Sequence, residues 1–246
     1  MELLKKKLEE QFGQQFIVDF SKKGVTLIAK DKSHAFCMGF TYYLTDFRFR
    51  EKLIALKRFE EVEKLLQPIL KKYKIGQGDF VLAVYDCGFF STIKELIPFK
   101  NIPTINHSLI SDSQDISLED EVQIENALFE IKKAIDYAKI HFVDKYQTLN
   151  NVFEASEKMN EDQIAVFFAN PTLLRKIIID YRINNNYDLK HSIENRIISY
   201  REAEKEYPDS FKNYAEATEA LYEKLKSLEQ WIRYIVAAVL RYSLVG

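Results

Sequence analysis

Glycine and proline are scarce in this sequence, and they are unevenly distributed. The 246 residues include seven glycines and five prolines, about 5% of the chain where roughly 12% is usual. Six of the glycines lie within the first 88 residues, and after Pro103 the only prolines are Pro171 and Pro208. Turns and strand connections use glycine, whereas long helices exclude it. We therefore predict a mixed first segment of ~110 residues and an almost wholly helical remainder.

Cysteine and long apolar runs are also scarce. Cys37 and Cys87 are the only cysteines, which excludes a disulfide framework, and the charged segment 1–11 does not resemble the apolar part of a signal peptide. A membrane-spanning helix needs ~20 apolar residues. The closest stretch, 231–245, is shorter and contains Arg233 and Arg241. We expect a cytoplasmic protein with no membrane span.

The formal net charge of −2 argues against a dedicated nucleic-acid binder. The charge is divided along the chain, however, because residues 1–75 carry a net +6 and residues 111–246 a net −7. Nucleic-acid binding through the basic N-terminal half therefore stays open as an alternative. The other interpretation is two solvated surfaces of different composition.

Alternating apolar residues predict a small antiparallel meander sheet near the N-terminus. We expect a helix at 1–12, strands around 16–20, 25–29 and 36–42, and further strands at 80–85 and 104–110. A helix starting at Thr45 or Asp46 is expected to turn Phe49, Leu53, Leu56 and Phe59 inward and to kink or end at Pro68. The fold class is α+β, with an α+β domain at 1–112 and a helical domain at 113–246.

The C-terminal half has the spacing of an all-helical bundle. Apolar residues from Leu118 to Val152 follow a three-four spacing, with Ser117 as the expected N-cap. Shorter helices are expected around Ile164–Phe168, after Pro171, and around Ile193–Tyr200. These segments would supply the bundle against which the last helix packs.

The last helix carries the strongest pattern in the chain. From near Pro208, one heptad position holds Phe211, Thr218, Leu225, Ile232 and Val239, and the other holds Tyr214, Leu221, Leu228, Ile235 and Tyr242. A helix of this length measures about 50 Å. Either the helix predicted at 118–152 or a second copy of the chain would cover this coiled-coil seam, and both interpretations stay open.

Few residues suggest catalytic or metal chemistry. His34, Cys37, Cys87 and His107 together have the composition of a zinc site, but His34 and Cys37 lie an odd number of residues apart on a predicted strand and would face opposite sides. The triplets Glu130-Ile131-Lys132 and Asp188-Leu189-Lys190 have the spelling of a nuclease motif but lie in predicted helix or loop. We expect no catalytic site, no cofactor site and no metal site.

One enzymatic alternative involves Arg182 and His191. A histidine can act as a general acid or base beside a cation that stabilises a phosphate. This stretch resembles helical ribonucleases of the HEPN type, which place an arginine and a histidine four to six residues apart. Eight residues intervene here, which departs from that pattern, and the other interpretation is a polar loop with His191 as a capping residue.

Aromatic residues near the basic N-terminus suggest a weak alternative in RNA stacking. Phe36, Phe40 and Tyr42 share one strand face and are expected in the core, which leaves Tyr43 outward, with Lys22, Lys23, Lys30 and Lys32 on nearby turns. The preferred hypothesis is a non-enzymatic interaction or regulatory protein that self-associates through its C-terminal helix or binds a protein partner.

Overall fold

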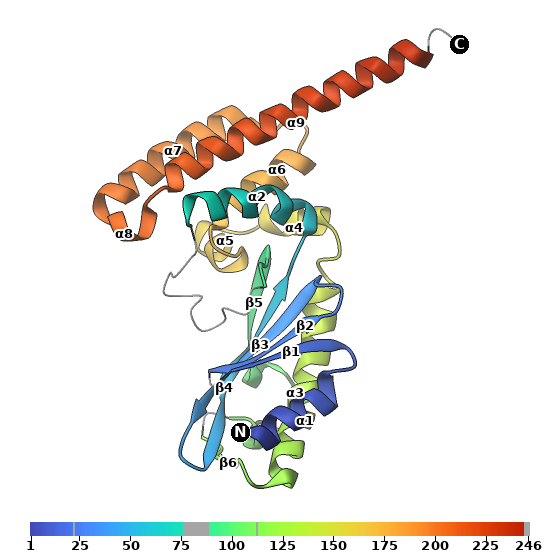
Figure 1. Ribbon diagram of the computed structural model, residues 1–246, viewed down its shortest axis with the longest axis vertical. Coiled ribbons are helices and arrows are strands. Elements are labelled where there is room, and N and C mark those ends of the chain that lie inside the picture. The colour runs from blue at the N-terminus through green and yellow to red at the C-terminus, as the bar shows by residue number, and fades with distance from the viewer. Residues whose placement is uncertain (22, 76–88, 112, 244–246) are drawn as a thin grey trace. The chain divides into compact units, whose positions relative to one another are not determined.

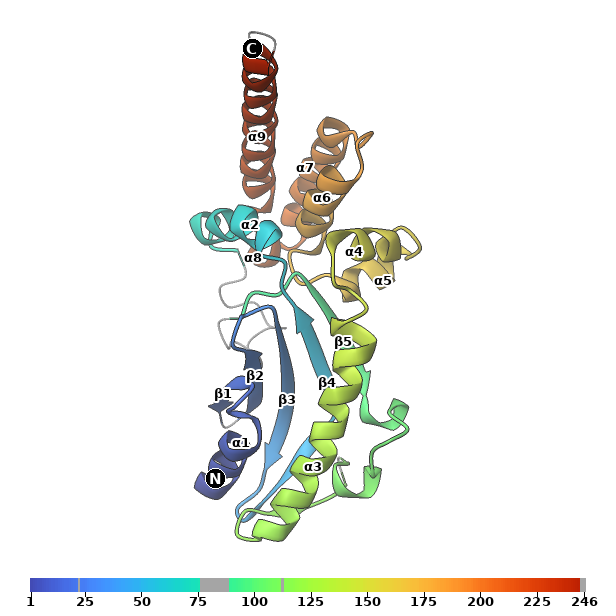
Figure 2. The same ribbon diagram turned by 90° about the vertical axis from the view of Figure 1, so that its right-hand side faces the viewer.

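The computed structural model describes residues 1–21, 23–75, 89–111 and 113–243, and it confirms a mixed α+β fold (Figures 1 and 2). The chain divides into two compact units. Unit 1 contains Met1–Glu63 and Phe80–Leu173, and unit 2 contains Lys64–Asp79 and Leu174–Gly246. Helix α3 (Glu121–Ala138) belongs to unit 1 and packs there against the N-terminal helix and the sheet.

Unit 1 is built on an antiparallel sheet in the order β1-β2-β3-β4-β5, with β6 paired to β4. The strands are β1 (Phe16–Ser21), β2 (Gly24–Ala29), β3 (His34–Tyr42), β4 (Asp46–Lys57), β5 (Ile93–Pro98) and β6 (Ile116–Ser117). The first three strands agree with the expected meander, since short polar turns join them. The strand expected at 80–85 lies outside the described residues. The segment 104–110 is not a strand but contains a short 3₁₀ turn, His107–Leu109 (η2).

Helices α1 (Glu2–Phe12) and α3 cover one face of the sheet. Leu4 and Leu8 of α1 are fully buried, as are Phe36, Phe47 and Leu53 on the strands below. Lys7 ties the two helices together with ion pairs to Glu121 and Glu125. These two carboxylates raise the pKa of Lys7 through hydrogen bonds, since they stabilise its charged form.

Strand β4 occupies a segment for which the sequence predicted a helix. Met38 of β3 pairs with Leu53, and Phe40 pairs with Phe49, so three residues of β4 face Gly39 alone. The two additional residues form a bulge. Phe49 and Leu53 are therefore successive side chains on the same face of β4 but lie four positions apart in sequence, where a regular strand has two. That spacing imitates a helical period, which is why the prediction was wrong. The helix that follows, α2, is Glu60–Tyr73 and continues through Pro68 to its end.

The helix predicted from Leu118 to Val152 is divided into three parts. Asp120, rather than Ser117, caps α3 by accepting a hydrogen bond from the backbone of Gln123 at 3.0 Å. A π-helical turn, Lys139–Val143 (η3), follows α3 directly, and α4 (Leu149–Ser156) and α5 (Glu161–Phe167) come next. The apolar residues of the expected pattern are buried all the same: Ile124, Leu128, Ile131, Ile135, Ala138, Phe142, Leu149 and Val152.

Unit 2 contains a helical hairpin. Helix α6 (Thr172–Ile183) leads into α7 (Leu189–Glu206), the short α8 (Pro208–Phe211) and α9 (Tyr214–Ser243). The last helix begins at Tyr214 and not near Pro208, because Asn213 adopts a left-handed conformation with φ 67°. Figure 1 shows α9 alongside α7 and continuing beyond it. None of the described helices is long and apolar enough to cross a membrane.

Strands β2 and β3 approach closely where Gly24 pairs with Gly39. A methyl group on Gly24 would lie 2.2 Å from the carbonyl oxygen of Met38, well inside contact distance. We therefore expect Gly24→Ala to lower the free energy of unfolding by roughly 2 kcal/mol or more, measured by urea denaturation. The matched control is Gly39→Ala, whose methyl group would meet only the flexible side chain of Arg50. Equal losses in both variants would contradict this account.

Candidate functional site

A pocket of about 430 Å³ lies at the β4 bulge, on the sheet face that α1 and α3 do not cover. Six residues line it, all from β3, β4 and the turn between them: Thr41, Tyr43, Arg48, Arg50, Glu51 and Lys52. We call this the bulge pocket. Its position follows from the strand irregularity, because Arg50, Glu51 and Lys52 are the three residues that face Gly39.

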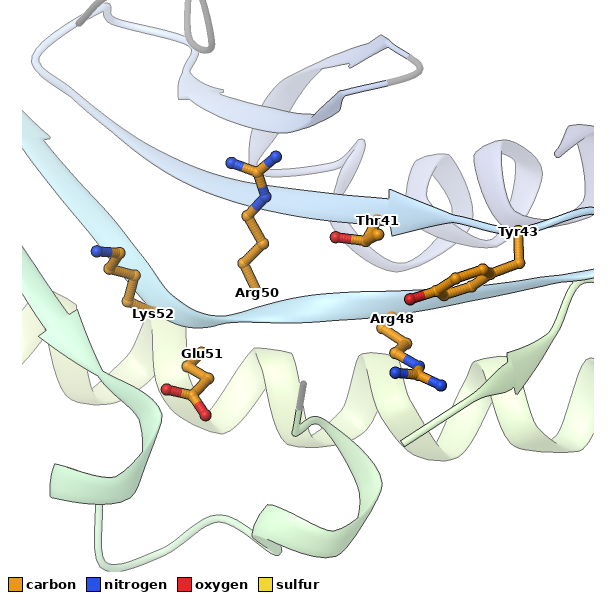
Figure 3. A pocket seen from close by; sticks show the side chains of 6 residues that line it. All are labelled: Thr41, Tyr43, Arg48, Arg50, Glu51 and Lys52. Carbon is orange, nitrogen blue, oxygen red and sulfur yellow. The ribbon is translucent and has the colours of Figure 1, made fainter. Parts of the chain in front are cut away.

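Arg50 occupies space that exists because residue 39 is a glycine. A Cβ atom at Gly39 would lie 2.7 Å from Cδ of Arg50 and 3.2 Å from its Nε. The arginine side chain therefore crosses the β3 backbone where any other residue would displace it. Figure 3 shows Arg50 leaning from β4 toward β3, whereas Arg48 and Glu51 lean the other way.

Arg48 is held by a carboxylate and an aromatic ring. Its Nε and Nη2 donate to both oxygens of Asp115, the second bond measuring 2.9 Å, and its guanidinium carbon lies 4.8 Å from the ring centroid of Tyr43. The hydrogen bonds from Arg48 lower the pKa of Asp115, because they stabilise the carboxylate. The Tyr43 ring is thereby held against a fixed cation while 49% of the residue stays exposed.

Along the edge of β4 that faces away from β3, the residues at the pocket lie between the part that pairs with β5 and the part that pairs with β6. Strand β5 pairs with Lys52–Lys57, and β6 pairs with Asp46 and Phe47. Among the described strands, neither pairs with residues 48–51 on that side. The cationic side chains therefore emerge at a gap in the sheet, and Arg50, Glu51 and Lys52 are exposed.

The bulge pocket is electrostatically positive. Within the described part of the chain, the side chains of Arg50 and Lys52 form no hydrogen bond or ion pair, while the guanidinium of Arg48 is paired with Asp115. The carboxylate of Glu51 is the one acidic group that lines the pocket, and it leans away from Arg50 in Figure 3. Two cations without counter-ions, a hydroxyl group and an exposed ring are groups suited to binding an anion.

The two residues of the ribonuclease alternative lie on consecutive helices. Arg182 is exposed in the last turn of α6, and His191 is exposed in the first turn of α7. The His191 ring forms its hydrogen bond with Asn195 at 3.0 Å, and no interaction joins it to Arg182 in the described residues. Asp188, rather than His191, caps α7 by accepting from the His191 backbone at 3.0 Å.

The zinc combination is also dispersed. The His34 ring lies against Phe16 and Phe36 on the helix-covered face of the sheet, whereas Cys37 is buried with Ala35, Ile54 and Leu56 on the other face. His107 is exposed on η2, and Cys87 lies outside the described residues. In the ranges that the structure describes, no three metal-binding side chains of histidine, cysteine, aspartate or glutamate come together.

The two acidic triplets differ from each other. Asp188 is an exposed cap, but Glu130 is 4% exposed. Its carboxylate accepts a hydrogen bond from the backbone of Asn106 at 2.7 Å and one from Lys133 Nζ at 2.8 Å. Glu130 therefore fastens the loop before β6 to α3.

The aromatic and basic residues singled out by the sequence lie partly at the bulge pocket. Phe36 and Phe40 are buried, whereas Tyr43 is half-exposed and lines the pocket. Lys23 lies next to it, since its carbonyl accepts a hydrogen bond from Phe40 at 3.0 Å, while Lys22 lies outside the described residues. Lys30 and Lys32 are exposed at the turn that joins the other ends of β2 and β3.

Sequence reasoning missed Arg48, Arg50 and Lys52. The signal for them was present, because Phe47, Arg48, Phe49 and Arg50 alternate between apolar and basic residues as a half-buried strand does. No known family model matches the chain, and no curated protein and no solved structure matches it either. The function must therefore be argued from the residues themselves.

Burial among aromatic rings lowers the pKa of His34. The unfolded chain, in which a histidine pKa is about 6.5, then binds this proton more readily than the folded chain. We expect the free energy of unfolding to fall as the pH drops below about 6.5, and His34→Leu to weaken that fall. Urea denaturation at pH 7.5 and 5.5 measures it, with the exposed His107→Leu as control. An unchanged pH dependence in His34→Leu would show that another group is responsible.

We expect the purified chain to leave single-stranded and structured RNA intact, because His191 and Arg182 are not joined. Incubation with end-labelled RNA, followed by denaturing gel electrophoresis, measures this. Cleavage by the unmodified chain that disappears in His191→Ala would instead establish the ribonuclease alternative.

Proposed function

We propose that the protein is a non-enzymatic interaction protein that self-associates through the distal part of α9. The observation that supports this most directly is a difference in length. Helix α9 has 30 residues, whereas its hairpin partner α7 has 18. The 12-residue difference corresponds to about 18 Å of helix. Figure 1 shows α9 continuing past the end of α7 by itself within unit 2.

The proximal part of α9 shows what its heptad positions do where a neighbour is present. Tyr214, Thr218, Leu221 and Leu225 occupy the two heptad positions and are at most 4% exposed. Tyr214 lies 5.1 Å from Tyr200 of α7 between ring centroids, and Arg201 pairs with Glu219 at 2.9 Å. Tyr181 of α6 also donates to the carbonyl of Leu225 at 3.3 Å. Heptad residues here are core residues of unit 2.

The same two positions continue to be apolar in the distal part of the sequence. Ile232, Ile235, Val239 and Tyr242 follow at unbroken heptad spacing. A seam of this type is stabilised by a second helix that carries the same seam, so two copies of the chain can cover each other across a twofold axis. We therefore assign a second copy as the occupant, in a short coiled coil. A cytoplasmic location accompanies the proposal, as the low cysteine content of the chain suggests.

The test is Ile235→Lys in the full chain. A buried lysine at a seam position would leave its charge without a partner, so the dimer is expected to dissociate at least tenfold more readily. Light scattering behind a sizing column, over at least a hundredfold range of protein concentration, measures the mass. The matched control is Glu223→Lys, which places the same side chain at an exposed position of the same helix.

Two results would contradict the proposal. One is a monomeric mass for the unmodified chain across the whole concentration range. The other is an unchanged dimer in Ile235→Lys, which would place the interface elsewhere. Circular dichroism of each variant confirms that the helices have formed, so a loss of dimer is not mistaken for unfolding.

A further inference from the structure

Two cations in the bulge pocket are presented without counter-ions. Arg50 crosses Gly39, and Lys52 lines the same pocket two residues further along β4 (Figure 3). Both are exposed, and in the described part of the chain neither donates to a carboxylate. Residues 50 and 52 are two positions apart within the bulge of β4. They are spaced to contact two anionic groups along one extended chain.

Arg48 has a different role from its two neighbours. Both oxygens of Asp115 already accept hydrogen bonds from it, so it is not free to bind a second anion in the same plane. Its guanidinium instead lies 4.8 Å from the Tyr43 ring centroid and holds that ring at the end of the pocket where Arg48 lies. The backbone of Tyr43 is fixed as well, because its N–H donates to the Asp46 carbonyl at 2.8 Å.

A half-exposed ring that lines the same pocket as two unpaired cations is an arrangement that can bind a nucleobase and its backbone. We propose that the bulge pocket binds single-stranded nucleic acid, with Arg50 and Lys52 on backbone phosphates and a base stacked on Tyr43. This inference goes beyond the proposed function and does not depend on it.

Two other anionic polymers fit the pocket less well. A duplex keeps its bases stacked on one another, so Tyr43 would have no base to contact. The carboxylates of an acidic peptide would satisfy Arg50 and Lys52 but offer no flat ring to stack on Tyr43. The combination of ring and cations therefore favours an unpaired nucleic-acid strand.

The test is fluorescence anisotropy of the full chain with a labelled 12-nucleotide single strand of mixed sequence, made as DNA and as RNA. The variant Arg50→Gln/Lys52→Gln is expected to bind at least tenfold more weakly. It should also reduce the slope of log affinity against log salt by about 1.4, since each phosphate contact on a single strand contributes about 0.7. Tyr43→Leu is expected to weaken binding about tenfold without changing that slope.

Two further variants separate the pocket from general basicity. Lys30→Gln removes one exposed positive charge at the far end of the sheet and is expected to change affinity less than twofold. Gly39→Ala keeps every charge but places a methyl group where Arg50 now lies, and it should weaken binding severalfold. Unfolding temperatures within about 2 °C of the unmodified chain show that the exposed substitutions leave the fold intact.

Four outcomes would overturn the inference. The first is no binding of the single strand at 50 mM salt, and the second is equal affinity for the corresponding duplex. The third is unchanged binding in Arg50→Gln/Lys52→Gln. The fourth is that polyglutamate displaces the strand as effectively as unlabelled oligonucleotide does. The last outcome would identify a surface for acidic proteins instead. Light scattering on the same samples records the oligomeric state, so a failure of self-association is distinguished from a failure of the pocket.

Discussion

The unequal pairing of β3 and β4 is the constraint on which the first unit depends. Three residues of β4 face Gly39 alone, yet the strands stay in register on both sides of this point, with Met38 opposite Leu53 and Phe40 opposite Phe49. Because the bulge adds an even number of residues, the apolar side chains return to the covered face beyond it. One additional residue instead of two would have turned Leu53 and Ala55 out of the core. The same irregularity gathers basic side chains on the opposite face.

The sequence predicted those elements in which local spacing and tertiary packing agree. Strands β1 to β3 alternate cleanly, and Ile124 to Ala138 follow a helical period along a helix that is buried on one side, so both were recognised. Strand β4 was mistaken for a helix because the bulge, which is a property of strand pairing, changed the spacing of Phe49 and Leu53. Strand β5 was missed because Lys94, Glu95 and the exposed Leu96 interrupt its apolar pattern. It is a strand because it pairs with β4.

The candidate site was less predictable than the fold. The bulge pocket consists of neighbours in sequence, but its character depends on two facts that no spacing reveals. Asp115, 67 residues from Arg48, pairs with that arginine, which is one of the three cations of the pocket. Gly39 provides the space for the side chain of Arg50, a second of the three. Tyr43 was expected outward and is half-exposed, since it follows β3 in the turn. Arg182 and His191, in contrast, are near in sequence but lie on two helices joined by a polar loop, and the His191 ring is hydrogen-bonded to Asn195.

The two proposals are linked through valency, although each stands on its own residues. A dimer carries two copies of the bulge pocket, so a strand bound at one copy meets the other at a raised effective concentration. A pocket with two phosphate contacts and one stacked base binds weakly by itself, and its affinity falls further as salt rises. Two such pockets on one strand combine their free energies of binding, less the cost of ordering the intervening nucleotides. Self-association through α9 is thus a physical means by which a protein of small net charge could bind a polyanion firmly.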